Sequence, residues 1–206
     1  MAEVVLVHGL WHRGWSMALL KRRLRRRGLE VRTFSHPTLA QDPAVSARAL
    51  AEFCRQSGVG PQHLLGHSLG GLLILAMLER TGQIPSGRVL LLGTPLNGSK
   101  VARRVARRRP GRLLLGCSRS WLEHGTRVSA GMVSCGMIAG NRGLGLGTLS
   151  GARLGPGDGT VALAETRHAL VDQRVELPVS HTGLLLSKSV ADQAIRYLQS
   201  GRFDPV

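Results

Sequence analysis

Short apolar runs alternate with amphipathic segments along most of this chain. The apolar runs predict strands over residues 3–7, 29–34, 62–66, 88–93, 133–139 and 173–177. Strands that alternate with helical patterns are typical of a sheet whose strands are joined by crossover helices. We therefore expect an α/β fold with a mostly parallel sheet of about six strands, flanked by helices on both faces.

The amphipathic segments predict those crossover helices. The first covers about 15–27 and is closed by Gly28, and Pro43 opens the second, AVSARALAEFCRQS, with Gly58 after its end. Further helices are expected over 69–80 and 188–200. Since no repeat or linker interrupts the series, residues 1–206 are expected to form a single domain.

Two segments depart from this alternation. Within residues 94–132, a basic helical stretch, SKVARRVARRR, is expected to stop at Pro110 and to be followed by a second helix around 113–123. Residues 140–159 are rich in glycine and are expected to be loop. Insertions between the strands of such a scaffold often carry binding and catalysis, so 94–132 is a candidate cap or lid.

Composition limits the class of protein. Its 206 residues, 43% of them hydrophobic, can bury a core without disulfides or metal. Three cysteines without C-x-x-C spacing indicate neither a disulfide framework nor a zinc site. The sequence MAEVVLVHGLW has neither a basic n-region nor a long apolar run, so we expect a cytoplasmic protein.

The net charge of +16 comes largely from KRRLRRR at 21–27 and from the arginines between 103 and 112. Such clusters attract polyanions, anionic lipid or acidic substrates, but they are also common on solvated helix faces. We expect at most weak contact with anionic membranes or polyanions through these basic helices, and no specific nucleic acid.

The sequence LLGHSLGG at 64–71 contains the motif G-x-S-x-G. In a chain rich in serine and glycine the motif alone is weak evidence. Its context is more informative, because an apolar strand precedes Gly66 and a helical pattern follows Ser68. A serine between a strand and a helix lies on a strained turn with an exposed hydroxyl, and flanking glycines permit close packing there.

The motifs VLVHGLW, GHSLGG, GDGTV and a late SH together resemble the α/β-hydrolase superfamily, nearest to its compact lipase and esterase branch. The similarity runs from about residue 3 to 203. The chain lacks the leading antiparallel strands of larger members, so it resembles the minimal form of the fold, with a sheet that begins at EVVLV.

The resemblance implies a catalytic triad in the order serine, acid, histidine. A serine hydroxyl needs a base, itself oriented by an acid, to act as a nucleophile at neutral pH. The implied residues are Ser68, Asp158 in GPGDGTV and His181 in LPVSHTG. Asp172 remains an alternative acid and His168 an alternative base, and either aspartate could be an ordinary turn residue.

The resemblance also implies two backbone donors for the oxyanion of the transition state, the N–H groups of Leu10 and Leu69. His8 and His67 adjoin the site, and we expect them to hydrogen-bond the loop backbone rather than react. No metal is expected, because the spacing of the histidines at 8, 12, 67 and 181 matches no zinc pattern. No cofactor is expected either.

The substrate-binding residues are not determined by the sequence. The arginines of 94–132 either face the mouth of the site or point to water while Val101 and Val105 pack inward. The tryptophans at 11, 15 and 121 either line an acyl pocket or pack elsewhere.

Three functional hypotheses follow. The first is a serine hydrolase of small-molecule or lipid-like carboxylic esters that forms an acyl-enzyme. The second is an acyltransferase or thioesterase with the same triad. The third is a non-catalytic anion-binding module, which the intact set of Ser68, Asp158 and His181 argues against.

Overall fold

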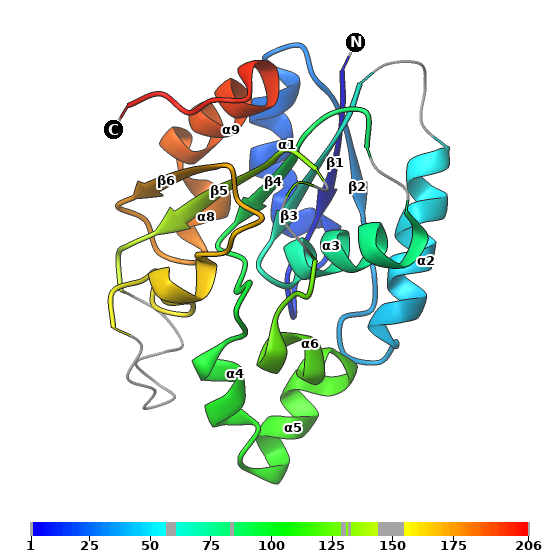
Figure 1. The fold of residues 1–206 in the computed structure, drawn as a ribbon, viewed down its shortest axis with the longest axis vertical. Coiled ribbons are helices and arrows are strands. Elements are labelled where there is room, and N and C mark those ends of the chain that lie inside the picture. Colours follow the sequence, from blue (N-terminus) through cyan, green and yellow to red (C-terminus); the bar gives the residue numbers. More distant parts are fainter. Residues whose placement is uncertain are drawn as a thin grey trace.

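Six parallel strands form the central sheet of the computed structural model (Figure 1). The structure describes residues 2–56, 61–82, 85–128, 131, 133–143 and 155–205. The strand order is β2-β1-β3-β4-β5-β6, and each neighbouring pair is parallel. The strands are β1 (Glu3–Val7), β2 (Glu30–Phe34), β3 (Gln62–His67), β4 (Val89–Leu92), β5 (Cys135–Gly140) and β6 (Gln173–Leu177). The predicted α/β class and six-stranded sheet are confirmed, although β5 begins two residues later than expected.

Helices cover both faces of the sheet (Figure 1). On one face lie α1 (Ala18–Arg25), α8 (Gly183–Leu186) and α9 (Lys188–Ser200), and on the other lie α2 (Pro43–Arg55) and α3 (Leu69–Thr81). Because β1, β3, β4 and β5 are buried along their whole length, their side chains fill two separate apolar layers.

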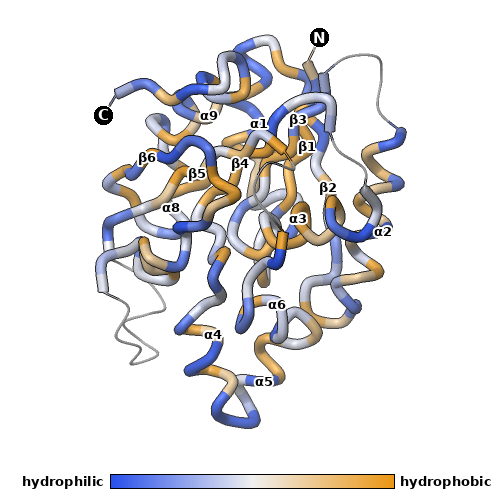
Figure 2. The backbone as a smooth tube through the Cα atoms, viewed as in Figure 1, coloured by the Kyte–Doolittle hydropathy of each residue, from blue (hydrophilic) through white to orange (hydrophobic). Residues whose placement is uncertain are grey.

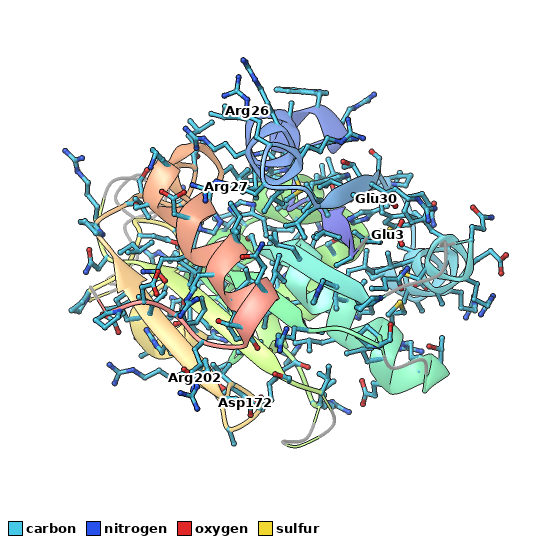
Figure 3. All side chains as sticks on the ribbon, turned by 90° about the horizontal axis from the view of Figure 1, so that it is seen from above. Glu3, Arg26, Arg27, Glu30, Asp172 and Arg202 are labelled. Carbon is cyan, nitrogen blue, oxygen red and sulfur yellow. The ribbon has the colours of Figure 1, made fainter. Side chains whose placement is uncertain are left out.

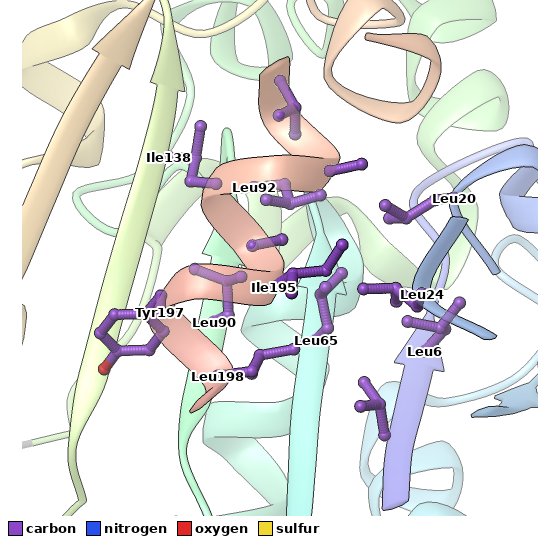
Figure 4. Packing of buried hydrophobic residues seen from close by; sticks show 14 of the residues in the cluster. Leu6, Leu20, Leu24, Leu65, Leu90, Leu92, Ile138, Ile195, Tyr197 and Leu198 are labelled. Atoms are coloured by element: carbon purple, nitrogen blue, oxygen red, sulfur yellow. The ribbon is translucent and has the colours of Figure 1, made fainter. Parts of the chain in front are cut away.

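The layer beneath α1 and α9 illustrates the packing (Figure 4). Leucines of β1, β3 and β4 meet leucines of α1 and the apolar face of α9. The fully buried members include Leu6, Leu20, Leu24, Leu65, Leu90, Leu92 and Tyr197. Burying one such leucine stabilises the fold by about 2 kcal/mol, so this layer anchors the strands whose carboxyl ends carry the candidate site.

Local signals explain several helix ends. The Asp42 side chain accepts a hydrogen bond from the Ala44 N–H at 2.8 Å, and Pro43 is the first residue of α2. Gly82 ends α3 with φ of 63°, a left-handed conformation that glycine adopts at low cost. The predicted helix over 15–27 is a 3₁₀ turn, η1 (Gly14–Met17), followed by α1. The end expected at Gly58 lies outside the described residues.

The insertion after β4 contains three short helices beyond the carboxyl edge of the sheet (Figure 1). They are α4 (Lys100–Val105), α5 (Arg109–Leu115) and α6 (Arg119–His124), with a 3₁₀ turn, η2 (Gly116–Ser118), before α6. The prediction that Pro110 stops a helix was wrong. Pro110 lies in the first turn of α5, where its missing N–H costs nothing. The second expected helix, 113–123, is divided between α5 and α6.

The chain between β5 and β6 is described only in part. Residues 144–154 of the predicted glycine-rich loop lie outside the described residues. The described remainder forms a turn closed by a bridge between Gly157 and Ala162, followed by a 3₁₀ turn, η3 (Leu163–Thr166). Among the described helices, each is too short or too polar to cross a membrane.

Candidate active site

Ser68 lies on a sharp turn between β3 and α3. Its φ of 53° and ψ of −119° are strained for a residue with a side chain. This conformation is the one that exposes a nucleophile at the carboxyl edge of a sheet. The predicted strand–serine–helix context of the motif is therefore present.

The glycines around Ser68 are required by close backbone approach. A Cβ at Gly70 would lie 2.2 Å from the Val7 carbonyl oxygen, and one at Gly71 would lie 2.0 Å from the Thr94 hydroxyl. A Cβ at Gly66 would lie 2.5 Å from the Gly71 nitrogen. Any side chain at these positions would push α3 away from the sheet and displace the turn.

Asp158 and His181 form a short hydrogen bond. His181 Nδ1 lies 2.6 Å from Asp158 Oδ2, and the backbone N–H of His181 donates to the Asp158 carbonyl at 3.0 Å. The other carboxylate oxygen accepts from the N–H groups of Thr160 and Val161 at 2.9 and 2.7 Å. The nearly fully buried carboxylate is thus held in one orientation, facing the imidazole.

Ser68 and His181 line the same cavity, as does Leu10. No hydrogen bond joins the Ser68 hydroxyl to His181 within the described part of the chain. Such contacts are often loose before a substrate is bound. Ser68 and His181, which is bonded to Asp158, therefore line one cavity, but the serine hydroxyl and the imidazole are not hydrogen-bonded to each other in the described part of the chain.

The alternative acid and base lie elsewhere. Asp172 accepts a hydrogen bond from the Cys135 N–H at 3.0 Å, which places it at the amino end of β5, opposite the cavity. His168 Nδ1 accepts from the Leu170 N–H at 3.2 Å in a half-exposed turn. Each side chain has a local backbone partner, and neither lines the cavity with Ser68.

Of the two expected oxyanion donors, Leu69 directly follows Ser68 in the chain and Leu10 lines the same cavity as Ser68. Leu69 is the first residue of α3, so its N–H has no acceptor within the helix. Leu10 lines the cavity in the loop after β1. His8 holds that loop: its Nδ1 donates to the Gly9 carbonyl at 3.0 Å, and its Nε2 accepts from the His36 N–H at 3.2 Å.

His67 contacts His181 through a hydrogen bond and through its ring. Its Nε2 donates to the His181 carbonyl at 3.2 Å, and the two ring centroids lie 4.7 Å apart. Burial, reinforced by the nearby His181 and His12, holds the pKa of His67 well below its usual value. His67 is therefore neutral, and its hydrogen bond holds the backbone of the loop that carries His181.

The cavity has a volume of about 380 Å³ and a largely apolar lining. The helices of the insertion contribute the apolar side chains of Val101, Ala102, Val105, Leu114, Leu115 and Leu122 to this lining. Of the tryptophans, Trp11 lines the cavity, whereas Trp15 is 76% exposed and Trp121, a residue of α6, packs against a buried apolar cluster. Val101 and Val105 face inward while Arg103 and Arg104 are exposed. Of the two arrangements expected for the insertion, the structure has the one in which the valines pack inward and the arginines point to water.

Comparisons with known proteins identify the family. A family model described as "Alpha/beta hydrolase family" matches residues 4–196. This chain belongs to the alpha/beta hydrolase family. A search of curated protein sequences found no match.

Solved structures share the fold of this alpha/beta hydrolase. The Bacillus licheniformis lipase BlEst2 in mature form is similar with a TM-score of 0.67 and 18% identity, over 89% of this chain and 86% of that one. The ydeN gene product from B. subtilis has a TM-score of 0.65 and 16% identity, over 97% and 100%. A pyrethroid hydrolase from Sphingobium faniae JZ-2 has a TM-score of 0.57 and 17% identity, over 97% and 98%. At these identities the likeness establishes the fold alone.

Sequence reasoning missed several residues of this hydrolase that shape the site. His12 lines the cavity and stacks on His67, with ring centroids 5.6 Å apart. A Cβ at Gly93 would lie 3.0 Å from Asp158 Oδ2 and 3.3 Å from His181 Nδ1, so glycine there leaves room for the pair. In the sequence, the signals that could have identified these two residues are the WH pair after HGL and the glycine that follows the fourth strand. Among the described residues, no three metal-ligating side chains are grouped to hold a metal ion.

The buried histidines of this hydrolase predict acid sensitivity. Burial lowers the pKa of His36 and His63 to about 4, and that of His67 well below its usual value. Below pH about 6.5 the unfolded chain binds protons that the folded chain does not, so the free energy of unfolding falls as the pH falls. His36 and His63 together are expected to account for a loss of roughly 3 kcal/mol between pH 6.5 and 5, and His67 adds to it.

Urea denaturation at several pH values measures this loss. The variant His63→Gln, which removes one of these groups, is expected to reduce the loss by roughly 1.5 kcal/mol. Unfolding free energies that are equal at pH 7.5 and pH 5 would contradict the neutral, buried state of these histidines.

Proposed function

We propose that this hydrolase cleaves carboxylic esters through an acyl-enzyme on Ser68. The observation that carries the proposal is the 2.6 Å hydrogen bond between Asp158 and His181 beside a strained serine in an apolar cavity. An oriented imidazole next to an exposed hydroxyl is the arrangement that activates a serine nucleophile.

In the first half-reaction, the Ser68 oxygen attacks the ester carbonyl while His181 Nε2 takes the hydroxyl proton. Asp158 fixes the His181 tautomer with Nδ1 protonated and stabilises the positive charge that develops on the ring. The Thr160 and Val161 N–H groups keep the carboxylate in place. His181 then returns the proton to the leaving alcohol, and the acyl group stays on Ser68.

The negative charge of the tetrahedral intermediate falls on the former carbonyl oxygen. In the proposal, the N–H groups of Leu10 and Leu69 receive it, and each such donor contributes about 3 kcal/mol to lowering the barrier. In the second half-reaction a water molecule gives a proton to His181 and attacks the acyl carbon. Ser68 is released with its proton restored, together with the carboxylic acid.

The apolar lining indicates an acyl chain as the main ligand. Val105 lies in the wall contributed by the insertion. The variant Val105→Trp is expected to lower kcat/KM for octanoyl esters at least about tenfold more than for acetyl esters, because it fills the space that a long chain needs.

A panel of p-nitrophenyl esters, triglycerides and phospholipids measures this preference. Val45→Trp, at an exposed position on α2, is the matched control and is expected to leave the ratio unchanged. If Val105→Trp lowers both esters equally, the acyl chain does not occupy this cavity.

A further inference from the structure

Three large apolar side chains are exposed at or next to the cavity: two of them line it, and Leu113 precedes Leu114 in α5. Trp11 is 46% exposed, Leu114 53% and Leu113 79%. The Trp11 indole donates a hydrogen bond to the Leu114 carbonyl at 2.8 Å, and these two residues also line the cavity. The rim of the cavity is therefore apolar and faces solvent.

The same part of the molecule carries unbalanced positive charge. The sequence has no acidic residue between Glu79 and Glu123. Between these positions, the α4–α5 segment has seven exposed cations: Lys100, Arg103, Arg104, Arg107, Arg108, Arg109 and Arg112. None of the seven forms an ion pair with any residue that the structure describes.

The apolar and charged groups share one end of the molecule. Figure 2 shows hydrophilic positions in the turn between α4 and α5 directly beside hydrophobic positions of α5, at the tip that extends beyond the sheet. We call Trp11, Leu113, Leu114 and the seven cations the mouth surface. Exposed apolar side chains surrounded by arginines are typical of proteins that lie on a membrane surface.

We propose that the mouth surface docks on an anionic lipid bilayer, with the cavity opening toward the headgroups. Cations near an anionic leaflet each raise binding about fivefold, and inserted apolar side chains add to it. A nucleic acid would neutralise the arginines but would leave Leu113, the most exposed of the leucines that the structure describes, in water. This docking goes beyond the ester hydrolysis proposed above and does not depend on it.

Cosedimentation of the intact chain with vesicles tests the proposal. Vesicles of phosphatidylcholine with phosphatidylglycerol are expected to bind the protein, and phosphatidylcholine alone is expected to bind it much more weakly. Binding to the mixed vesicles is expected to weaken as salt is raised. Equal binding to both vesicles would overturn the proposal.

Two charge-reversal variants locate the binding surface. Arg108→Glu with Arg109→Glu is expected to weaken binding about 25-fold or more. The matched control is Arg26→Glu with Arg202→Glu, which makes the same change in net charge at the amino edge of the sheet (Figure 3). The control is expected to weaken binding less than about threefold. Equal losses in the two variants would mean that net charge, not this surface, drives binding.

The apolar part is tested by Leu113→Ser, which is expected to weaken vesicle binding about tenfold and to leave binding to double-stranded DNA unchanged. If Leu113→Ser has no effect on vesicles, and DNA binds as tightly as the mixed vesicles, the surface serves a polyanion and the proposal is wrong. Circular dichroism of each variant confirms that it is folded. The same measurements on Ser68→Ala separate docking from hydrolysis, because that variant is expected to bind vesicles normally.

Discussion

Replacing Ser68 by alanine is expected to lower kcat for p-nitrophenyl esters by about 10⁴-fold or more. The reason is that, in the proposed mechanism, the acyl group is transferred to the hydroxyl oxygen of Ser68, and no other hydroxyl on the strained turn can replace it. Steady-state hydrolysis with a purified, folded variant measures the loss. Ser120→Ala, which changes an exposed serine on α6, is the matched control and is expected to retain full activity.

Residual activity above about a tenth of the parent enzyme would contradict this prediction. The site would then use another nucleophile or a directly activated water molecule, and the strained turn at Ser68 would need a different explanation.

The second large effect is expected from Asp158→Asn, which should lower kcat by about 10³–10⁴-fold. The Asn side chain presents either an oxygen or an NH₂ group to His181, and the NH₂ group stabilises the tautomer whose Nε2 carries the proton. Such an imidazole cannot accept a proton from Ser68. The asparagine also removes the negative charge that stabilises the imidazolium.

Asp172→Asn is the comparison for this variant. It is expected to change kcat less than about threefold, since Asp172 bonds the Cys135 N–H at the far edge of the sheet. Its main cost is about 1 kcal/mol of stability from the weakened hydrogen bond. Greater damage to kcat from Asp172→Asn than from Asp158→Asn would overturn the assignment of the acid.

The sheet could be predicted because its central strands are buried on both faces. Short, continuous apolar runs such as EVVLV and RVLLLG are typical of strands that are buried on both faces of a parallel sheet. The edge strands β2 and β6 are partly exposed, and their bounds agree with the expected ranges, 29–34 and 173–177, to within one residue. The order of the strands depends on crossovers that local sequence does not determine.

The insertion after β4 was harder to predict, because its helices are short and are stabilised by tertiary packing. Pro110 is compatible with the end of one helix or the first turn of the next, and only the chain path decides between them. Gly111 fits against the Val105 carbonyl, where a Cβ would lie 1.9 Å away. That close approach of α5 to the end of α4 has no periodic signature in the sequence.

In the site, too, the residues within local motifs could be predicted and the contacts that depend on tertiary packing could not. Ser68, Asp158 and His181 each lie beside a recognisable motif, so the resemblance identified them. The two N–H groups that fix the carboxylate follow from the GDGTV turn, but the contacts of His67 and His12 join segments far apart in the chain. The apolar cavity depends on which face of each short helix turns inward, and that is a property of packing.

Reaction with a fluorophosphonate probe, followed by peptide mass spectrometry, tests most directly whether Ser68 is the nucleophile. We expect one probe per chain, located on the peptide that contains Ser68, with labelling of His181→Ala slower by about 10³-fold. A folded protein that stays unlabelled, or that carries the probe on a different residue, would show that Ser68 is not the nucleophile.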